Sequence, residues 1–345
     1  MSLAAQLYPL LKPWLFRMDA ERAHEWTTRM MRLSHACGLL TAGTVRGPRG
    51  APVSCLGLSF PNRLGLAAGM DKSASAVEAW AALGFGFVEV GTLTPRPQPG
   101  NAKPRLFRLP EHEALINRMG FNNPGIHAAV KRLRQRRTSA VVGVNIGKNF
   151  DTPNEEAVRD YLACLQAAYE VADYIAVNIS SPNTKGLREL QAEDSIRALL
   201  GALKQEQERL AVSVGKRVPL LVKIAPDLDD AQIEALARVF HELAVDGVIA
   251  TNTTLSREAV AGHALAGEAG GLSGAPVAGR STEVVQAFRQ LLGAGTPLIG
   301  VGGILSGADA LAKREAGADL VQVYSGLVYR GPGLISDVLE ALRQA

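Results

Sequence analysis

Short apolar runs recur along the chain from residue 64 onward, and each ends in glycine or a small polar residue before a segment compatible with a helix. The runs are LGLAAG (64–69), FVEVGT (87–92), VVGVNIG (141–147), YIAVNIS (174–180), PLLVKIAP (219–226), GVIATNT (247–253), PLIGVGG (297–303) and LVQVYSG (320–326). Near-continuous apolar strands separated by helices are typical of a parallel sheet that is buried on both faces. Eight such units favour an α/β fold of the closed (β/α)8 TIM-barrel type over an open doubly wound sheet.

A proline-rich insertion, residues 94–125, interrupts this pattern between the second and third runs. Within it, RLFRL (105–109) and ALIN (114–117) are short apolar segments that could pair as a hairpin. Long insertions at the C-terminal face of a barrel usually build or cover the active site. We therefore expect this segment to lie near the site.

A second segment outside the eight units is the N-terminal region, residues 1 to about 45. Asp19 predicts an N-cap for a helix from Ala20 to about Ala36, Gly38 predicts its end, and a shorter helix is expected around residues 3–16. Large apolar side chains, including two of the three tryptophans, alternate here with basic residues. This pattern fits an interfacial helix pair on a membrane, and it equally fits a helical cap docked on the barrel.

The composition narrows the class of protein. The chain has 345 residues, 47% hydrophobic and 20% charged, which excludes disorder as the main state. Its three cysteines have neither metal-site nor disulfide-framework spacing. No apolar run approaches the roughly 18 residues of a membrane span, and the N-terminus does not resemble a signal peptide. The net charge of +4 is too diffuse to indicate nucleic acid. We expect a protein inside the cell, either soluble or attached to a membrane face.

Polar side chains stand at the predicted C-terminal ends of the strands, where barrel active sites lie. They include amides and hydroxyls at four strand ends, and a lysine inside a fifth strand. The positions are Gly69, Thr92, Asn145, Asn178, Lys223, Thr251, Asn252, Gly303 and Ser325. A single amide at a strand end is ordinarily a turn residue, but this many are hard to attribute to turns.

Three motifs at this face suggest chemistry. The glycines of GVGG, with Ser325 of the last strand, fit a phosphate site between the last two strand loops, although glycine also serves turns. Lys223 is costly in a barrel strand unless an anion meets it, which leaves either an internal ion pair or a charge that stabilises a cofactor or substrate. The AAGMDKS loop (67–73) adds Asp71 and Lys72, either as site residues or as a surface turn.

Ten motifs in order resemble the dihydroorotate dehydrogenase family, and they span essentially the whole chain. They are LGLAAGMDK, TPRPQPGNAKPRLFRL, INRMGFNN, VNIGKN, NISSPNTKGLR, VKIAPDL, GVIATNTT, GGLSG, PLIGVGGI and VQVYSG. The N-terminal helical segment, and serine where soluble relatives carry cysteine, resemble the membrane-associated, quinone-reducing class 2. The resemblance implies oxidation of (S)-dihydroorotate to orotate in de novo pyrimidine synthesis, with flavin mononucleotide (FMN) as hydride acceptor and a membrane quinone as the final acceptor.

The resemblance also implies the site residues. Those expected to bind FMN are Ala68, Gly69, Met70, Asp71, Lys72, Thr92, Asn145, Asn178, Lys223, Thr251, Gly274, Gly303, Tyr324 and Ser325. Those expected to bind the substrate are Lys72, Asn117, Arg118, Met119, Gly120, Phe121, Asn178, Asn183, Asn252 and Thr253. Ser181 resembles the catalytic base. Because a free serine is a poor base, we hypothesise that a water and Thr184 relay its proton. Lys223 would support the negative charge of reduced flavin.

The resemblance divides the chain into a segment 1–45, which would meet the membrane and form a quinone tunnel, and an FMN-binding barrel 46–345. His24, Arg108 and Tyr324 are candidates for the inner end of that tunnel. The protein would attach peripherally to the cytoplasmic face of the cell membrane, without nucleic acid, metal or an obligate protein partner. Three alternatives stay open: a soluble-class enzyme using fumarate or NAD, a flavin-free lyase or isomerase with a Schiff base on Lys223, and a binding protein using KRLRQRR (131–137).

Overall fold

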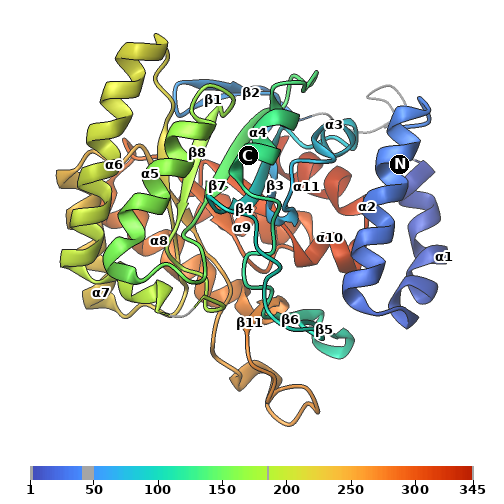
Figure 1. Cartoon of the computed structure of the whole chain (residues 1–345). Coiled ribbons are helices and arrows are strands. Elements are labelled where there is room, and N and C mark those ends of the chain that lie inside the picture. Colours follow the sequence, from blue (N-terminus) through green and yellow to red (C-terminus); the bar gives the residue numbers. More distant parts are fainter. Residues whose placement is uncertain (1–2, 41–49, 185, 344–345) are drawn as a thin grey trace.

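Eight parallel strands close into a barrel in the computed structural model, which describes residues 3–40, 50–184 and 186–343 (Figure 1). In chain order the strands are β3 (Leu64–Asp71), β4 (Phe87–Leu93), β7 (Val141–Ile146), β8 (Tyr174–Asn178), β9 (Leu220–Ile224), β10 (Gly247–Ala250), β12 (Leu298–Val301) and β13 (Leu320–Val323). Each begins within one residue of a predicted apolar run. The barrel prediction is confirmed, and the open doubly wound sheet is wrong because β13 pairs with β3 and closes the sheet.

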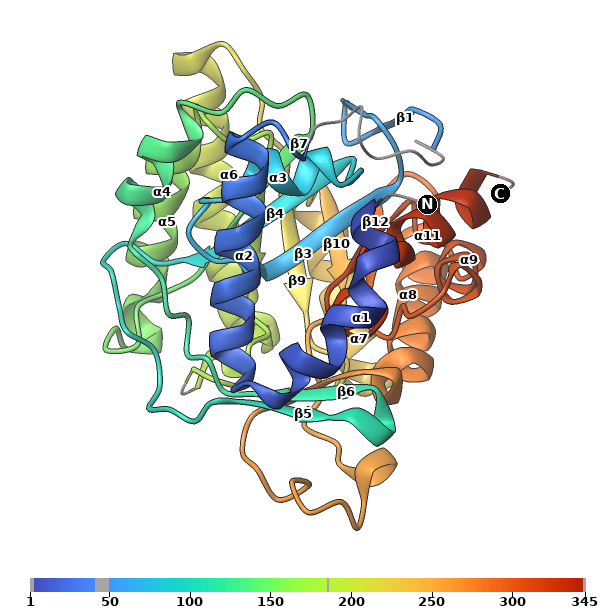
Figure 2. The same ribbon diagram turned by 90° about the vertical axis from the view of Figure 1, so that its right-hand side faces the viewer.

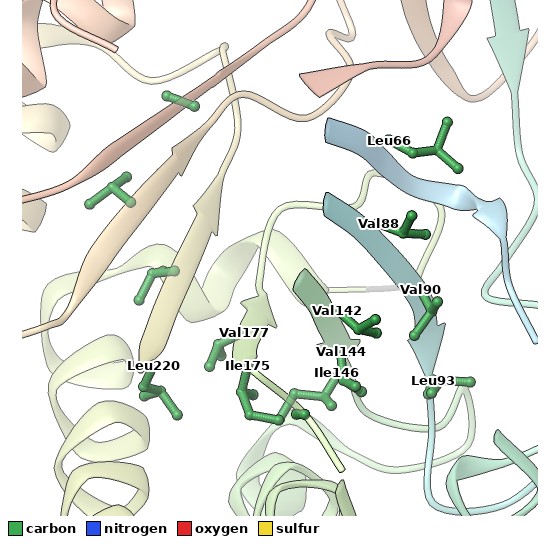
Figure 3. Close-up of a cluster of buried hydrophobic side chains, with 14 of the residues drawn as sticks. Leu66, Val88, Val90, Leu93, Val142, Val144, Ile146, Ile175, Val177 and Leu220 are labelled. Carbon is green, nitrogen blue, oxygen red and sulfur yellow. The ribbon is translucent and has the colours of Figure 1, made fainter. Parts of the chain in front are cut away.

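Helices surround the barrel and bury the outward faces of the strands. They are α3 (Val77–Ala82), α4 (Ile126–Leu133), α5 (Ala157–Ala168), α6 (Glu193–Val214), α7 (Asp230–Glu242), α8 (Ala278–Leu292), α9 (Gly307–Glu315), α10 (Ser325–Arg330) and α11 (Gly333–Arg343). Figure 3 shows part of the resulting core, in which Val142, Val144 and Ile175 pack with apolar side chains from neighbouring strands. Because both faces of each strand are buried, the strand sequences are mainly apolar rather than alternating.

The N-terminal end of the barrel is closed by an apolar layer. The hairpin of β1 (Val53–Cys55) and β2 (Leu58–Phe60) lies at this end (Figure 1). Phe60 packs edge-on against Phe87, and Phe87 against Tyr174, inside the barrel. Because this end is filled by side chains, a ligand can enter the barrel only from the opposite end, as is general for this fold.

The insertion forms a small sheet at the C-terminal end of the barrel (Figure 1). The predicted hairpin is confirmed as β5 (Leu106–Leu109) and β6 (Ala114–Asn117), joined by the 3₁₀ turn η1 (Pro110–His112). A third strand, β11 (Gly271–Gly274), pairs with β6 and was not predicted. The remaining 3₁₀ turns are η2 (Asn154–Glu156), η3 (Leu187–Gln191), η4 (Glu258–Val260) and η5 (Ala275–Val277).

Two N-terminal helices, α1 (Leu3–Arg17) and α2 (Ala20–Ala36), lie against the side of the barrel, where α2 contacts α3 and β5 and α1 contacts α11 (Figure 2). The Asp19 side chain accepts a hydrogen bond from the Arg22 amide, which confirms the predicted cap, and Gly38 follows the helix end with φ of 72°. The domain boundary predicted near residue 46 lies outside the described residues. Within the described part of the chain, no helix combines the length and apolar character that a membrane crossing requires.

Candidate active site

One cavity opens at the C-terminal end of the barrel, and most of the predicted site residues line it. It brings together residues from the ends of seven barrel strands and from the insertion. Those present are Ala68, Gly69, Lys72, Thr92, Asn117, Met119, Gly120, Phe121, Asn178, Ser181, Asn183, Lys223, Thr251, Asn252, Thr253, Gly274, Gly303, Tyr324 and Ser325. Residues that are far apart in sequence converge here because the C-terminal ends of parallel barrel strands all face the same way.

Four predicted residues lie outside this cavity. The buried Asp71 carboxylate accepts hydrogen bonds from the Ser75 and Ala76 amides, at 2.9 and 2.8 Å, which fixes the loop after β3. Met70 faces the N-terminal helices. Arg118 pairs with Glu268 at 2.5 Å, and Asn145 lies beneath the cavity floor in the network described next. For these four, as for the residues that line the cavity, a direct contact with cofactor or substrate stays a prediction.

Amide and hydroxyl side chains at three adjacent strand ends form one hydrogen-bonded network. Thr92 Oγ donates to Asn145 Oδ1 at 2.6 Å, and Asn178 Nδ2 donates to Thr92 Oγ at 2.9 Å and to Asn145 Oδ1 at 3.2 Å. All three side chains are buried. Buried polar networks that are satisfied in this way hold each group in one orientation. The cavity therefore presents amides in a preset arrangement.

A carboxylate that the sequence analysis missed, Glu89 of β4, lies in the barrel interior below this network. It is fully buried and accepts hydrogen bonds from Asn145 Nδ2 at 2.8 Å, Tyr174 Oη at 2.9 Å and Gln322 Nε2 at 2.7 Å. The Lys223 ammonium lies 3.7 Å from its Oε1. Lys223 thus has an internal ion pair, and it also reaches the cavity. The signal for Glu89 was available, since an acidic residue in the apolar run FVEVGT is as unusual as Lys223 in its own strand.

The loop that carries Ser181 is held by hydrogen bonds from both sides. Ser181 Oγ accepts from the Asn183 amide at 3.2 Å. Arg188 of η3 donates to the Ser180 carbonyl at 3.0 Å and to the Thr253 carbonyl at 2.8 Å. In the described part of the chain no hydrogen bond joins Ser181 to the buried Thr184, so the proposed proton relay stays a prediction.

Several buried polar atoms in the cavity have no protein partner in the described residues. They are Asn183 Oδ1, Thr253 Oγ and Gln322 Oε1. Unpaired buried polar atoms are rare in native proteins and indicate a missing ligand or water. They can bind a flat heterocycle with ring N–H and carbonyl groups. Their presence fits both a flavin ring and a pyrimidine.

Charge in the cavity is supplied by lysines. Lys72 Nζ donates one hydrogen bond, to the Gly69 carbonyl at 2.8 Å, which leaves donors free for an anion. Burial lowers the pKa of Lys72 to about 8, so its ammonium is largely charged at neutral pH. Together with Lys223 it favours anionic occupants.

At the far end of the cavity, next to the last two barrel strands, a bound group can approach the backbone closely. Gly303 has φ of 74°, and a Cβ there would meet Ala278 Cα at 2.3 Å, so only glycine fits. The Ser273 and Ser325 hydroxyls lie 2.8 Å apart beside it. Hydroxyls next to a tight glycine turn after the last two barrel strands suit a phosphate.

A second, largely apolar cavity lies between the N-terminal helices and the barrel. Its walls come from α1, α2, β5 and α10, and they include His24, Arg108 and Tyr324. Lys72, Met119 and Tyr324 line both cavities, so the two meet there. Burial lowers the pKa of His24 to about 3 and raises the pKa of Tyr324 to about 12, so both are neutral at physiological pH.

Known proteins resemble this chain over nearly its whole length. The model of the family "Dihydroorotate dehydrogenase" matches residues 51–345. A protein of Chromobacterium violaceum named "Dihydroorotate dehydrogenase (quinone)" is 59% identical over 338 residues, which cover 98% of each chain. One of the same name from Xanthomonas euvesicatoria is 58% identical, covering 98% of this chain and 96% of that protein. The crystal structure of DHODH from Eimeria tenella in complex with ferulenol matches with a TM-score of 0.85 and 40% identity, covering 92% of this chain and 90% of the other.

Proposed function

The chain belongs to the dihydroorotate dehydrogenase family, and we infer that it oxidises (S)-dihydroorotate to orotate with FMN as the hydride acceptor and a quinone as the final electron acceptor. The reaction is a step of pyrimidine synthesis. The observation that carries this proposal is a preset amide cavity, with a serine on its wall, that meets an apolar cavity at Tyr324. Family membership disfavours the flavin-free lyase and the pure binding protein.

FMN fits the floor and the far end of the first cavity. We propose that Thr92, Asn178 and Lys223 contact its ring and that Gly303 and Ser325 hold its phosphate. The unpaired Gln322 Oε1 is a free acceptor deep in the cavity, and it could accept a hydrogen bond from a ring N–H. The chemistry that bound FMN would supply is a hydride acceptor for C6 of the substrate and a two-electron donor for the quinone. Metal binding is not needed for this chemistry, and within the described residues no cluster of acidic, histidine and cysteine side chains forms a metal site.

Dihydroorotate would lie between FMN and the Ser181 loop. Lys72 is the cation proposed for its carboxylate, and Asn117, Asn183 and Asn252 are proposed for its ring amides. Asn183 Nδ2 already donates to Asn117 Oδ1 at 3.1 Å, which leaves Asn183 Oδ1 free to accept from a ring N–H. Amides suit this task because they stay neutral and do not compete for the substrate proton.

Ser181 is proposed to take the proton from C5. The amide hydrogen that Asn183 donates to Ser181 Oγ stabilises negative charge on that oxygen and orients it. Positioned bases of this kind contribute typically about 10²- to 10⁴-fold to a rate.

The apolar cavity supports a quinone as acceptor. A quinone ring and its isoprenoid tail need an apolar passage to the flavin, whereas fumarate and NAD are polar. The names of the relatives at 58–59% identity give the same acceptor. Arg108 donates to the Phe16 and Met18 carbonyls, at 3.2 and 2.9 Å, and would present its remaining donors to a quinone carbonyl.

A direct test compares acceptors with the purified protein. Dihydroorotate should bleach the flavin absorbance, and the reduced protein should be reoxidised quickly by a quinone and slowly by fumarate or NAD. A protein that carries no flavin, or whose flavin dihydroorotate cannot reduce, would refute the assignment. Fast reoxidation by fumarate or NAD would refute only the quinone.

We also propose that the N-terminal helices attach the protein to the cytoplasmic face of the membrane. Large exposed apolar side chains gather on α1, namely Leu7, Leu10, Leu11 and Trp14, and the basic residues Lys12 and Arg17 lie on the same helix. Apolar side chains with interspersed bases are what a helix at an anionic lipid surface requires.

Leu10→Glu should weaken binding to anionic liposomes by about tenfold or more, because inserting one leucine contributes about 1.5–3 kcal/mol. Leu10 is 76% exposed. Sedimentation with liposomes would measure the effect, and turnover with a small soluble acceptor should stay unchanged. Val212→Glu on α6, where the side chain is 87% exposed, is the matched control and should bind as the wild type does. Equal losses in both variants would contradict a membrane face on α1.

A further inference from the structure

A buried ion pair joins α2 to the insertion that carries substrate-side residues. Glu21 on α2 is 4% exposed, and Arg105 just before β5 is 6% exposed. Arg105 Nη2 donates to Glu21 Oε1 at 2.7 Å, and Arg105 Nε donates to Glu21 Oε2 at 3.1 Å. Burial alone would raise the pKa of Glu21, but Arg105 and the nearby Lys103 lower it below its usual range. The pair is therefore ionised at neutral pH and held in one geometry by two bonds.

The other side of the Arg105 guanidinium holds a loop of the insertion. Arg105 Nη1 donates to the Pro99 carbonyl and to the Asn101 carbonyl, both at 2.7 Å. One side chain thus links α2 to the loop of residues 97–101. A lysine could not make these four contacts together, since they need the planar fork of arginine.

This loop lies directly on residues of the proposed substrate site. The Asn101 amide donates to the Met119 carbonyl at 3.1 Å, and Asn101 Nδ2 donates to the Arg118 carbonyl at 2.9 Å and to the Asn183 carbonyl at 3.4 Å. A Cβ on Gly100 would meet the Met119 carbonyl oxygen at 2.2 Å, so the two backbones are in direct contact. Met119 and Asn183 both line the first cavity.

We propose that Glu21 and Arg105 are positioning residues through which α2 holds the dihydroorotate site in its binding geometry. The inference rests on the substrate proposed above. Neither side chain lines the first cavity, so each acts through Asn101 and the backbone of residues 118–120. Because Glu21 and His24 also line the apolar cavity, the same contacts join the quinone side to the substrate side.

Thermodynamic linkage requires the coupling between α2 and the substrate site to be reciprocal, so it can be measured at either place. If α2 stabilises the substrate site, then orotate must stabilise the docked position of α2 by the same factor. Orotate should therefore slow amide hydrogen exchange in α2 of the wild type. A purely structural ion pair would leave that exchange unchanged when orotate binds.

The test measures the Kd of orotate by the change it causes in flavin absorbance, using the full-length FMN-loaded protein. Glu21→Gln keeps the shape of the side chain but removes its charge, and it should raise the Kd by about tenfold, within the usual range of coupling between sites. Glu25→Gln is the matched control. Glu25 lies one turn further along α2 and is 62% exposed at the side chain, with only a 3.8 Å contact to Lys103.

Asn101→Ala provides a second variant that leaves the buried ion pair intact. It should also raise the orotate Kd. In the double variant, the fold-increase in Kd should be smaller than the product of the two single-variant increases, because Glu21 and Asn101 act in series on the same site. In Glu21→Gln, orotate should no longer slow exchange in α2. FMN content should stay near that of the wild type in all three variants.

The results separate this proposal from the assignment of function. If the wild type does not bind orotate, the proposed substrate is wrong. If the wild type binds orotate and both Glu21→Gln and Asn101→Ala bind it equally well, the positioning role is wrong. The positioning role is also overturned if Glu25→Gln weakens orotate binding as much as Glu21→Gln does.

Discussion

Replacing Ser181 with alanine should slow reduction of the flavin by dihydroorotate by about 10²- to 10⁴-fold, the usual contribution of a positioned base. FMN content and orotate affinity should stay close to wild type, because Arg188 still holds the loop through the Ser180 carbonyl and only the Asn183 amide loses its bond to the Ser181 hydroxyl. Stopped-flow bleaching of the flavin under anaerobic conditions would measure the rate. The alanine variant lacks the only oxygen that is proposed to accept the C5 proton.

Ser181→Cys is the conservative control for this variant. A thiol at this position can still accept a proton. We expect the cysteine variant to be reduced faster than the alanine variant at alkaline pH, where the thiolate fraction rises. An alanine variant that is reduced at the wild-type rate would remove Ser181 from the mechanism.

The barrel could be predicted from the sequence because its determinants are local. Each strand is mainly apolar and leads into a small or polar residue, which is the pattern expected of a buried parallel strand. The cap at Asp19 and the hairpin of residues 106–117 are likewise defined within a few residues. Agreement between local signals of this kind and the global fold is expected of natural sequences.

What could not be predicted depends on pairs of residues that are distant in sequence. β11 is only four residues long and is defined by its pairing with β6, about 150 positions earlier. The ion pair of Glu21 with Arg105 spans 84 positions. The sequence around Glu21 or Arg105 does not indicate this pairing, because a lone Glu on a helix ordinarily faces solvent.

The catalytic face could be predicted only in part from the sequence. Its polar strand ends were visible in the sequence, and the barrel rule placed them in one cavity, but their orientations come from contacts among them. Thr92, Asn145 and Asn178 become a single network only once β4, β7 and β8 are adjacent. The pairing of Lys223 with Glu89 similarly decides how a substitution at Lys223 should be interpreted.

Lys223→Ala should lower both the FMN content and the reduction potential of the bound flavin. Loss of one partner of a buried ion pair typically costs about 3–5 kcal/mol, because the other charge is left unpaired. Here the unpaired charge is the Glu89 carboxylate, and it would disfavour an anionic reduced flavin nearby. We expect the potential to fall by about 30 mV or more, which corresponds to about 1.4 kcal/mol for a two-electron couple. Redox titration against a reference dye would measure it.

Variants at Glu89 separate the charge of Lys223 from its packing. Glu89→Gln leaves Lys223 charged without its counter-ion, so the flavin potential should rise above that of the wild type. Gln at position 89 can still accept from Asn145, Tyr174 or Gln322, which preserves part of the buried network.

The double variant Lys223→Met/Glu89→Gln removes both charges and should regain much of the FMN content lost in Lys223→Ala, since a buried pair can be replaced by neutral residues at little cost. Its potential should lie between those of the two single variants. If all four proteins share one potential at full FMN occupancy, Lys223 has only a structural role.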